Sequence, residues 1–334
     1  MSHHHHHSKV AGEAVGADRV AELLSGPARK VVVTTHRKPD GDAAGSMIAM
    51  ARMLRGLGHD VVMWHVEGPG LPDHLTWLLA PGETVVSGPV DDHDERIVVS
   101  VDAATSHRVT DDDPCTLGAP IINIDHHHDN PLWGHFNLVD GGASSTAEMV
   151  VRVADALGVT IDEDIALPLY VGLVTDTGRF SYANTGAEAH VVAARLVDAG
   201  VEPAVVYRRL FEGVPLGDMR LFGHALASSR SELGGRFVVA VITDADVAAA
   251  GGTDSDGVAE ALRAVEGAEV SAVIRQVPGG WRVSSRASGD AVDVSAIAAL
   301  EGGGGHRAAA GFSSERDPDD IIRMMCEAIE AQHG

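Results

Sequence analysis

The sequence at residues 30–46 is KVVVTTHRKPDGDAAGS. It begins with a short apolar, β-branched run at 30–35, which is typical of a strand buried on both faces. Residues 42–58 then carry apolar side chains at helical spacing and end at a glycine, which predicts a helix. A buried strand followed at once by a helix is the repeating unit of an α/β fold with a parallel sheet.

The alternation of strand-like and helix-like segments continues beyond this stretch. Further short apolar runs stand at residues 60–65, 96–101 and 119–124. Helical segments follow them at residues 145–157, 163–174, 187–199 and 216–229. We therefore predict an α/β protein with an N-terminal doubly wound, mostly parallel sheet, followed by a helical connector.

The character of the sequence changes near Gly234. A strand is predicted at 236–243, a hairpin at 269–287 that turns at Pro278-Gly279-Gly280, and a last helix near 319–331. These segments predict a smaller C-terminal α/β domain with a mixed sheet. The boundaries that we place are residues 15–200 for the first domain, 201–233 for a helical linker and 234–334 for the second domain. Residues 1–10, MSHHHHHSKV, resemble a purification tag, and we exclude their histidines from the candidate site.

Composition narrows the classes of protein and of partner. The 334 residues include 25 Lys and Arg against 48 Asp and Glu, which gives a formal net charge of −23. Proteins that bind long nucleic acid draw much of their affinity from Lys and Arg on phosphates, so we expect no long duplex as a partner. No apolar run is long enough to cross a bilayer, so we expect no membrane partner. Cys115 and Cys326 form no disulfide framework, which favours a cytoplasmic protein.

Histidine and aspartate residues gather at the ends of three predicted strands. They are His36, Asp40 and Asp42 after the first strand, Asp102 after the run 96–101, and Asp125, His126 and His127 after the run 119–124. Ligands bind open parallel sheets at the carboxyl ends of the strands, so these side chains are expected at one edge. Each acid alone is explained as a turn former or helix cap, but their coincidence at three strand ends favours a metal site.

The types of donor indicate the class of metal. Carboxylate and imidazole groups without thiolate suit Mn²⁺, Mg²⁺ or Fe²⁺ better than a structural Zn²⁺. The donors are too many for one ion, whereas two ions about 3.5–4 Å apart would use them. Asp176, in the motif Thr175-Asp176-Thr177-Gly178, adds a further carboxylate, although a helix C-terminal turn explains it equally well. Two divalent ions would also supply the positive charge that a phosphate substrate needs.

Four glycines and a histidine form a second motif, Gly302-Gly303-Gly304-Gly305-His306. Glycines let the backbone approach a ligand closely and expose consecutive N–H groups to an anion. A flexible loop is the simpler interpretation of a bare glycine run. The neighbouring Arg307, and Arg286 at the end of a predicted strand, favour phosphate binding instead.

Together these motifs resemble the DHH phosphoesterases that carry the DHH-associated C-terminal domain. Within that family they look like the small bacterial oligoribonucleases, or nano-RNases, that also act as pAp phosphatases. The resemblance covers about residues 30–312, with the motifs in the family's order. The motifs are HRKPDGDAAGS (36–46), Val101-Asp102, DHHHDN (125–130), ASSTAE (143–148), TDTG (175–178) and GGGGH (302–306).

The resemblance implies a role for each site residue. His36 and Asp40 would hold one Mn²⁺, Asp42, His126 and Asp176 would hold the other, and Asp102 would bridge both. Asp125 would orient a histidine and His127 would lie beside the scissile phosphate, so the implied catalytic residues are Asp102, Asp125 and His127. The substrate's distal part would be bound by Arg286, Gly303, Gly304, Gly305 and His306 of the second domain. His128 stands where the family usually has another residue, and we expect it on the surface or beside the ligands.

The resemblance also implies a reaction. Two divalent ions, Mn²⁺ first and Mg²⁺ or Fe²⁺ as alternatives, would activate a bridging hydroxide that attacks a phosphoester. The implied substrates are nano-RNA of two to five nucleotides, pAp, and dinucleotides such as pApA and c-di-AMP, all short enough for an acidic protein. The products would be mononucleotides. A homodimer through the helical stretch 143–229 is a further expectation.

Three other functions remain open. A family II inorganic pyrophosphatase shares the first half of the pattern but has a different second domain, without the GGGGH segment. A RecJ-type exonuclease would need further domains and a basic or aromatic track, whereas aromatic residues make up only 4% of this chain. A nucleotide-sensing module that has lost catalysis would lack a metal ligand, and every expected ligand position here carries a suitable residue.

Overall fold

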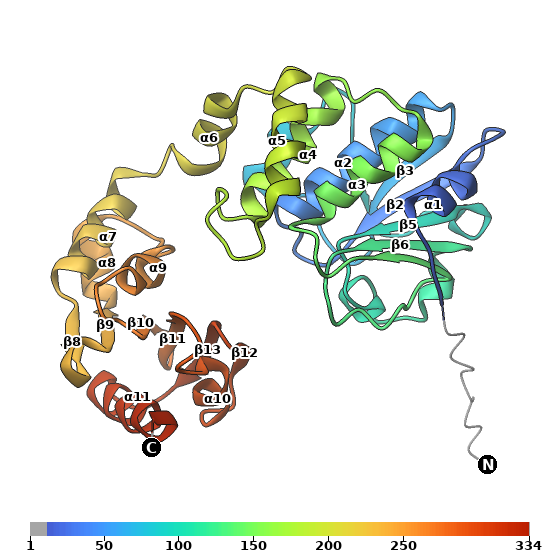
Figure 1. Cartoon of the computed structure of the whole chain (residues 1–334). Helices are drawn as coiled ribbons and strands as arrows, with labels where there is room; N and C mark the ends of the chain where they lie inside the picture. Colours follow the sequence, from blue (N-terminus) through green and yellow to red (C-terminus); the bar gives the residue numbers. More distant parts are fainter. Residues whose placement is uncertain (1–11, 334) are drawn as a thin grey trace, which may run out of the picture. The chain divides into compact units, whose positions relative to one another are not determined.

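Residues 12–333 are described by the computed structural model, and they divide into two units, one up to Leu210 and one from Phe211 onward (Figure 1). Each unit has its own sheet and its own apolar core. Within the described residues, no helix is both long and apolar enough to cross a bilayer. The tag-like residues 1–10 lie outside the described part of the chain.

The first unit is built on a seven-stranded sheet in the order β1-β7-β6-β5-β2-β3-β4, and all of its strand pairs are parallel. The strands are β1 (Glu13–Ala14), β2 (Lys30–Thr35), β3 (Asp60–His65), β4 (Val85–Ser87), β5 (Ile97–Val101), β6 (Ile121–Asp125) and β7 (Phe136–Val139). The predicted α/β fold with a parallel sheet is thereby confirmed. The short strands β1, β4 and β7 escaped prediction because two to four residues give no readable periodicity.

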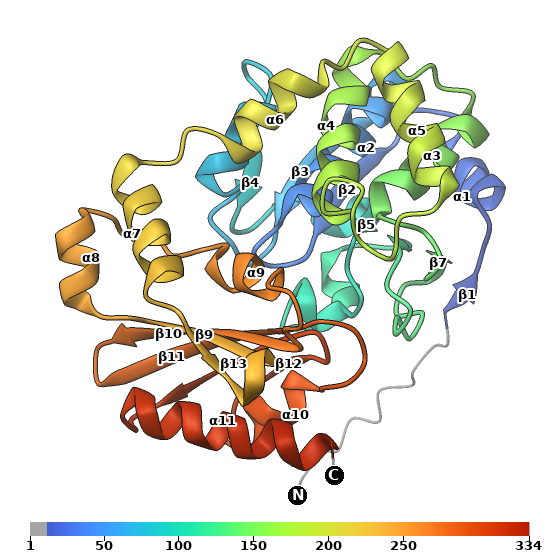
Figure 2. The ribbon, with the colours of Figure 1, turned by 60° about the vertical axis from the view of Figure 1, so that its left-hand side comes forward.

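Helices cover one face of this sheet (Figure 2). They are α1 (Ala17–Leu24), α2 (Gly41–Gly56), α3 (Thr146–Leu157), α4 (Glu163–Asp176), α5 (Ala187–Asp198) and α6 (Pro203–Phe211). Helix α2 is buried without a break over residues 41–51, because it packs against strands of the sheet and also against α4. The opposite face of the sheet carries loops and short 3₁₀ turns over a smaller apolar core around Val32, Trp64 and Val98.

Helix α4 contains a proline and still runs without interruption. Pro168 has no N–H, so the carbonyl of Asp164 loses its helical partner. The guanidinium of Arg52 on α2 donates a hydrogen bond to that carbonyl instead. The same helix pair approaches closely at Gly45, where an added Cβ would lie 2.1 Å from the carbonyl oxygen of Pro168.

The second unit holds a six-stranded mixed sheet in the order β12-β13-β11-β10-β9-β8, in which only β9 and β10 pair in parallel. The strands are β8 (Arg230–Glu232), β9 (Phe237–Ile242), β10 (Val270–Val277), β11 (Gly280–Ala287), β12 (Gly304–His306) and β13 (Ala309–Ser314). The predicted mixed sheet is confirmed, and β10 and β11 form the predicted hairpin.

Helices lie on both faces of this second sheet (Figure 2). One face packs against α10 (Val294–Ala299) and α11 (Pro318–His333). The other face packs against α7 (Leu216–Ala227), α8 (Asp244–Ala250) and α9 (Val258–Arg263). Near β12 and β13 the face that carries α9 is only partly covered, since Ala309 and Gly311 are partly exposed there.

Candidate metal centre

The carboxyl ends of β2, β5 and β6 bring histidine and aspartate side chains to one edge of the first sheet. Three groups of donors have ligand atoms within 4.8 Å of one another. The groups are His36, Asp40 and Asp102; Asp42, His126 and Asp176; and Asp102, His126 and His127. The strand-end pattern in the sequence therefore picks out side chains that lie together in space.

His36 presents one ring nitrogen to the carboxylates. Its Nδ1 lies 2.6 Å from the carbonyl oxygen of Arg37, and because a carbonyl only accepts, Nδ1 is the donor. The other nitrogen, Nε2, faces the carboxylates and lies 3.4 Å from Oδ2 of Asp102 and 4.0 Å from Oδ1 of Asp40. Asp40 also caps α2 by accepting a hydrogen bond from the backbone N–H of Ala43 at 3.0 Å. Capping and ligation are thus compatible at Asp40, whose side chain is largely exposed.

Asp42 is fully buried and is held by the start of α3. The backbone N–H groups of Thr146 and Ala147 donate to its carboxylate at 2.7 and 2.9 Å. The N-terminus of a helix favours a negative charge, so these two hydrogen bonds fix the position of the carboxylate and favour its ionised form. The hydroxyl of Thr146 also donates to Oδ1 of Asp102 at 3.1 Å. The motif ASSTAE (143–148), to which the resemblance assigns no role, therefore positions two of the candidate ligands.

Asp102 lies at the centre of the arrangement and belongs to two of the three groups. It is buried, and its Oδ1 lies 3.6 Å from Nε2 of His126. Its backbone is left-handed, with φ of 58°, a conformation that aspartate and asparagine tolerate better than other non-glycine residues. Such local strain persists where the surrounding structure demands one side-chain direction.

His126 and His127 point to different partners. Nε2 of His126 lies 3.1 Å from Oδ2 of Asp176, the last residue of α4. Nδ1 of His127 lies 2.7 Å from Oδ1 of Asp125, whose Oδ2 accepts a hydrogen bond from Asn130 at 2.7 Å. Burial alone would raise the pKa of Asp125, but the hydrogen bonds from His127 and Asn130 lower that pKa below its usual range. Asp125 is therefore an ionised carboxylate that orients His127, and its hydrogen bond raises the pKa of that ring.

The negative charges of the three other buried acids, Asp42, Asp102 and Asp176, are unfavourable when no metal ion is bound. Burial raises the pKa of Asp42 to about 6 and that of Asp102 well above its usual range. Burial and the charges of Asp42 and Asp102 raise the pKa of Asp176 to about 9. Within residues 12–333 the ion pairs of these three acids are with histidine, and none is with lysine or arginine. Buried carboxylates with imidazole nitrogens and no balancing cation form a donor set that fits divalent metal ions.

The candidate substrate residues lie in the second unit. The registers of β11, β13 and β12 place Arg286 opposite Ala309 and Ala309 opposite His306, so their side chains share one face of the sheet. Arg286 pairs with Glu260 of α9 at 2.6 Å, and His306 is exposed. The small side chain of Ala309 leaves the space between them open.

Some glycines of the GGGGH motif are required by close packing, whereas another leaves space for a ligand. An added Cβ at Gly303 would lie 2.3 Å from the carbonyl oxygen of Gly311, and one at Gly305 would lie 2.5 Å from that of Ala309. These two positions need glycine because β12 packs closely on β13. Gly304 has no atom within 4 Å of an added Cβ, so it alone of the three leaves room for a ligand.

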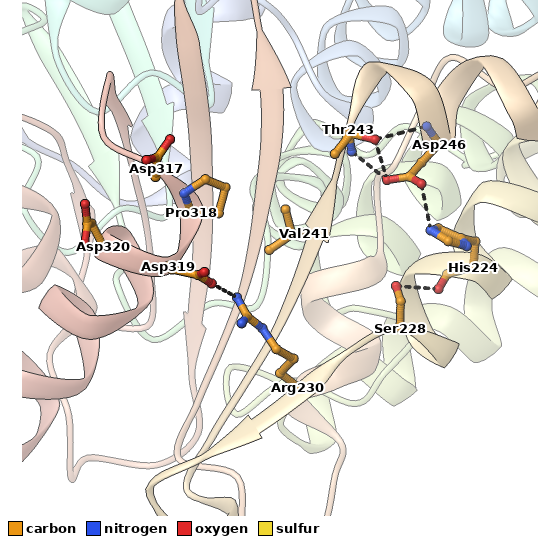
Figure 3. Close-up of a pocket in the computed structure, with 10 residues that line it drawn as sticks. All are labelled: His224, Ser228, Arg230, Val241, Thr243, Asp246, Asp317, Pro318, Asp319 and Asp320. Carbon is orange, nitrogen blue, oxygen red and sulfur yellow. Dashed lines mark hydrogen bonds and ion pairs between the residues drawn. The ribbon is translucent and has the colours of Figure 1, made fainter.

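A cavity of about 570 Å³ lies elsewhere in the second unit (Figure 3). It is lined by residues of α7, β8, β9, α8 and the start of α11, and by none of the residues predicted from the sequence. Its polar side chains satisfy each other, as His224 does with Asp246 at 3.1 Å and Arg230 with Asp319 at 2.9 Å. We therefore assign it no part in the candidate site.

Comparison with known proteins decides the family. Residues 30–173 match the domain described as "DHH family, N-terminal domain", and residues 234–331 match the "DHHA1 domain". A Thermus thermophilus protein named bifunctional oligoribonuclease and PAP phosphatase NrnA is 37% identical over 319 residues, which cover 94% of this chain and 93% of that protein. This chain belongs to the DHH family. The resemblance seen in its motifs is confirmed, and with it the enzyme class, a hydrolase of phosphoesters.

Other proteins match over nearly the whole chain. A Bacillus subtilis protein of the same name is 26% identical over 310 residues, covering 91% of this chain and 95% of its own length. An exopolyphosphatase-related protein from Bacteroides fragilis superposes with a TM-score of 0.83 at 21% identity, covering 94% of this chain and 95% of that one. Exonuclease RecJ bound to manganese superposes with a TM-score of 0.52 at 15% identity, covering 96% and 94%. At these identities the two structural likenesses show the fold alone.

Two features of the DHH centre were not assigned from the sequence. The N–H groups of Thr146 and Ala147 that hold Asp42 belong to the backbone, and backbone donors leave no trace in residue type. Asn130 stands in the DHHHDN motif, yet nothing in the sequence indicates that it bonds Asp125. His128 of the same motif is exposed and belongs to none of the donor groups.

Proposed function

We propose that this chain is a divalent-metal-dependent phosphoesterase that converts short oligoribonucleotides, pAp, and dinucleotides such as pApA and c-di-AMP to mononucleotides. The observation that carries the proposal is the set of three donor groups at one sheet edge, which are linked because Asp102 and His126 each belong to two of them. It stands in a chain that is similar over nearly its whole length to an oligoribonuclease and PAP phosphatase.

The donor groups would hold two ions. His36, Asp40 and Asp102 would hold one, while Asp42, His126 and Asp176 would hold the other together with Asp102. When bound, such ions supply positive charge to phosphoryl oxygens and lower the pKa of water. Mn²⁺ is the first candidate and Mg²⁺ or Fe²⁺ are alternatives, because mixed carboxylate and imidazole donors suit these metals.

His127 is placed to give a proton to the leaving oxygen. Its Nδ1–H is bound by Asp125, so its Nε2 is the atom that remains free to donate. The hydrogen bond to Asp125 raises the pKa of His127, which favours the protonated ring, and the lowered pKa of Asp125 favours an ionised partner. Asp125 thus orients His127 and stabilises its charge, while His127 protonates the ribose oxygen as the phosphoester bond breaks.

The second unit would bind the distal part of the substrate. Arg286 and His306 share a face of the sheet with Gly304, which pairs with Gly311 of the neighbouring strand β13. Glu260 holds the guanidinium of Arg286 in place, and the edge strand β12 would offer backbone N–H groups to an anion.

A direct experiment compares substrates and metals. Metal-stripped protein is reloaded with Mn²⁺, Mg²⁺ or Fe²⁺ and tested on pAp, pApA, c-di-AMP, RNAs of two to five nucleotides and inorganic pyrophosphate. We expect metal-dependent release of mononucleotides and no hydrolysis of pyrophosphate. Preferential hydrolysis of pyrophosphate, or no hydrolysis of any nucleotide, would contradict the proposal.

The variant Asp102→Asn tests the metal assignment. Asparagine keeps the left-handed backbone but loses the charge, so we expect at least about a thousandfold loss of kcat/KM with an intact fold. Metal content, measured by mass spectrometry, should fall below two ions per chain. The exposed Asp112 in the following loop supplies a matched control, and Asp112→Asn should retain both metal and activity. Full activity in Asp102→Asn would remove the basis of the two-ion site.

A further inference from the structure

Arg108 is an arginine near the candidate metal centre whose guanidinium is not paired with a carboxylate of the described residues. It ends the 3₁₀ turn Ser106–Arg108, which follows Asp102 along the chain. Its side chain is exposed, and its guanidinium makes no hydrogen bond or ion pair with any described residue. Other arginines of the first unit, such as Arg52 and Arg96, are paired with carboxylates. In a chain with a net charge of −23, an unpaired guanidinium beside a cluster of acids needs an explanation.

The backbone of Arg108 is firmly held. Its carbonyl oxygen accepts a hydrogen bond from the backbone N–H of Arg37 at 2.6 Å, which ties the turn to the residue after His36. Farther along, Val109 and Thr110 are buried, and the Thr110 hydroxyl donates to Glu67 at 2.9 Å. The same Glu67 carboxylate pairs with the guanidinium of Arg37. The backbone of the turn is therefore anchored on both sides of Arg108, whose exposed side chain is not held by any described residue.

The fold places Arg108 beside the centre. Arg108 is linked to two of the candidate ligands: to Asp102 through the short chain segment between them, and to His36 through the hydrogen bond to the Arg37 backbone. A phosphate placed at the centre would be close to this guanidinium.

We propose that Arg108 binds a non-bridging oxygen of the scissile phosphate. This inference rests on the proposed function. A guanidinium offers two parallel N–H donors that match a phosphate, and here no carboxylate competes for them. Because the backbone is already anchored, binding orders only one side chain. Charge accumulates on the phosphoryl oxygens during transfer, so the contact would strengthen in the transition state.

The test uses two substrates that share the scissile phosphate and differ in the terminal one, pApA and ApA. With Mn²⁺ bound, Arg108→Ala should lower kcat/KM for both by at least about thirtyfold, because a charge-assisted phosphate contact is lost. Arg108→Lys should recover part of the loss, since it keeps the charge but not the paired donors. Arg208 on α6 is also exposed and makes no ion pair with described residues, so Arg208→Ala is the matched control and should stay within about twofold.

A second measurement does not depend on catalysis. Calorimetry of AMP binding to the Mn²⁺-loaded protein should show at least about tenfold weaker binding in Arg108→Ala and none of this change in Arg208→Ala. Unchanged rates and unchanged AMP affinity in Arg108→Ala would overturn the inference. A loss confined to pApA would also overturn it, because Arg108 would then bind the terminal phosphate. If wild-type protein hydrolyses no nucleotide, the proposed function fails, and AMP binding alone decides the role of Arg108.

Discussion

Asp102 combines a left-handed backbone conformation with a place in two of the three donor groups. Its φ of 58° belongs to the left-handed region, where alanine is strained by about 1–2 kcal/mol and asparagine much less. We therefore predict that metal-free Asp102→Ala is less stable than metal-free Asp102→Asn by about 1 kcal/mol. Urea unfolding of the two variants measures this difference. Equal stabilities would mean that the loop relaxes and that its strain is not imposed by the fold.

Asp176 sets the pH dependence of the metal-free protein. Its pKa is about 9 in the folded chain against an ordinary value of 3.8, so the fold binds this proton more tightly than the unfolded chain does. The stability that results is present at low pH and is lost as the pH rises toward 9. Asp42 and Asp102 are shifted in the same direction.

We predict that the melting temperature measured in a chelator falls between pH 5 and pH 9, and that Asp176→Asn reduces the slope. Added Mn²⁺ should raise the melting temperature most at the alkaline end, because the ions replace the bound protons. A metal-free melting temperature that rises over this range would contradict the assignment.

Among the elements, α2 and α4 depend on a close approach at Gly45. A Cβ there would lie 2.1 Å from the backbone oxygen of Pro168, which cannot move without moving α4. We predict that Gly45→Ala destabilises the chain by about 2–3 kcal/mol through overpacking. Gly56 ends the same helix with nothing within 4 Å of an added Cβ, so Gly56→Ala should be neutral or stabilising by up to about 1 kcal/mol. Urea unfolding compares the two, and equal effects would refute the packing argument.

Long elements could be predicted from the sequence and short ones could not. The helical spacing after Asp42 predicts α2 within two residues of its observed ends, because a four-turn helix repeats its pattern. Strand β7 and helix α10 have four and six residues, too few for a period to show. The glycine motif shows a different limit, because Gly303 is required by packing on β13 whereas Gly304 is open. Residue type alone cannot separate these two reasons for glycine.

The donor side chains could be predicted because the topology of a parallel sheet largely determines where they lie. In a parallel sheet every strand points the same way, so residues that follow β2, β5 and β6 reach one edge whatever their separation in sequence. The groups that hold those donors could not be predicted. Thr146 acts through its backbone N–H and Asn130 through its side-chain amide, and both depend on where a helix or loop comes to lie.

For the whole molecule, the net charge of −23 favours short substrates. A long RNA brings many phosphates toward an acidic surface, and this repulsion is screened by salt. We predict that kcat/KM falls as RNA lengthens from two to about ten nucleotides at low ionic strength, and that added salt narrows the difference. Initial rates on a length series at two salt concentrations test this. Faster cleavage of the longer RNAs at low salt would refute it. The homodimer expected from the sequence stays a prediction.

The spread of the ligands along the chain also has a consequence for the order of events during synthesis. His36 leaves the ribosome long before Asp176, on the order of ten seconds at ordinary rates of translation. A nascent chain therefore has to bring three strands into register and close α4 over α2 before both ion sites exist. Incomplete chains that end before Asp176 would therefore hold only part of the donor set, and under the proposed function they would be inactive.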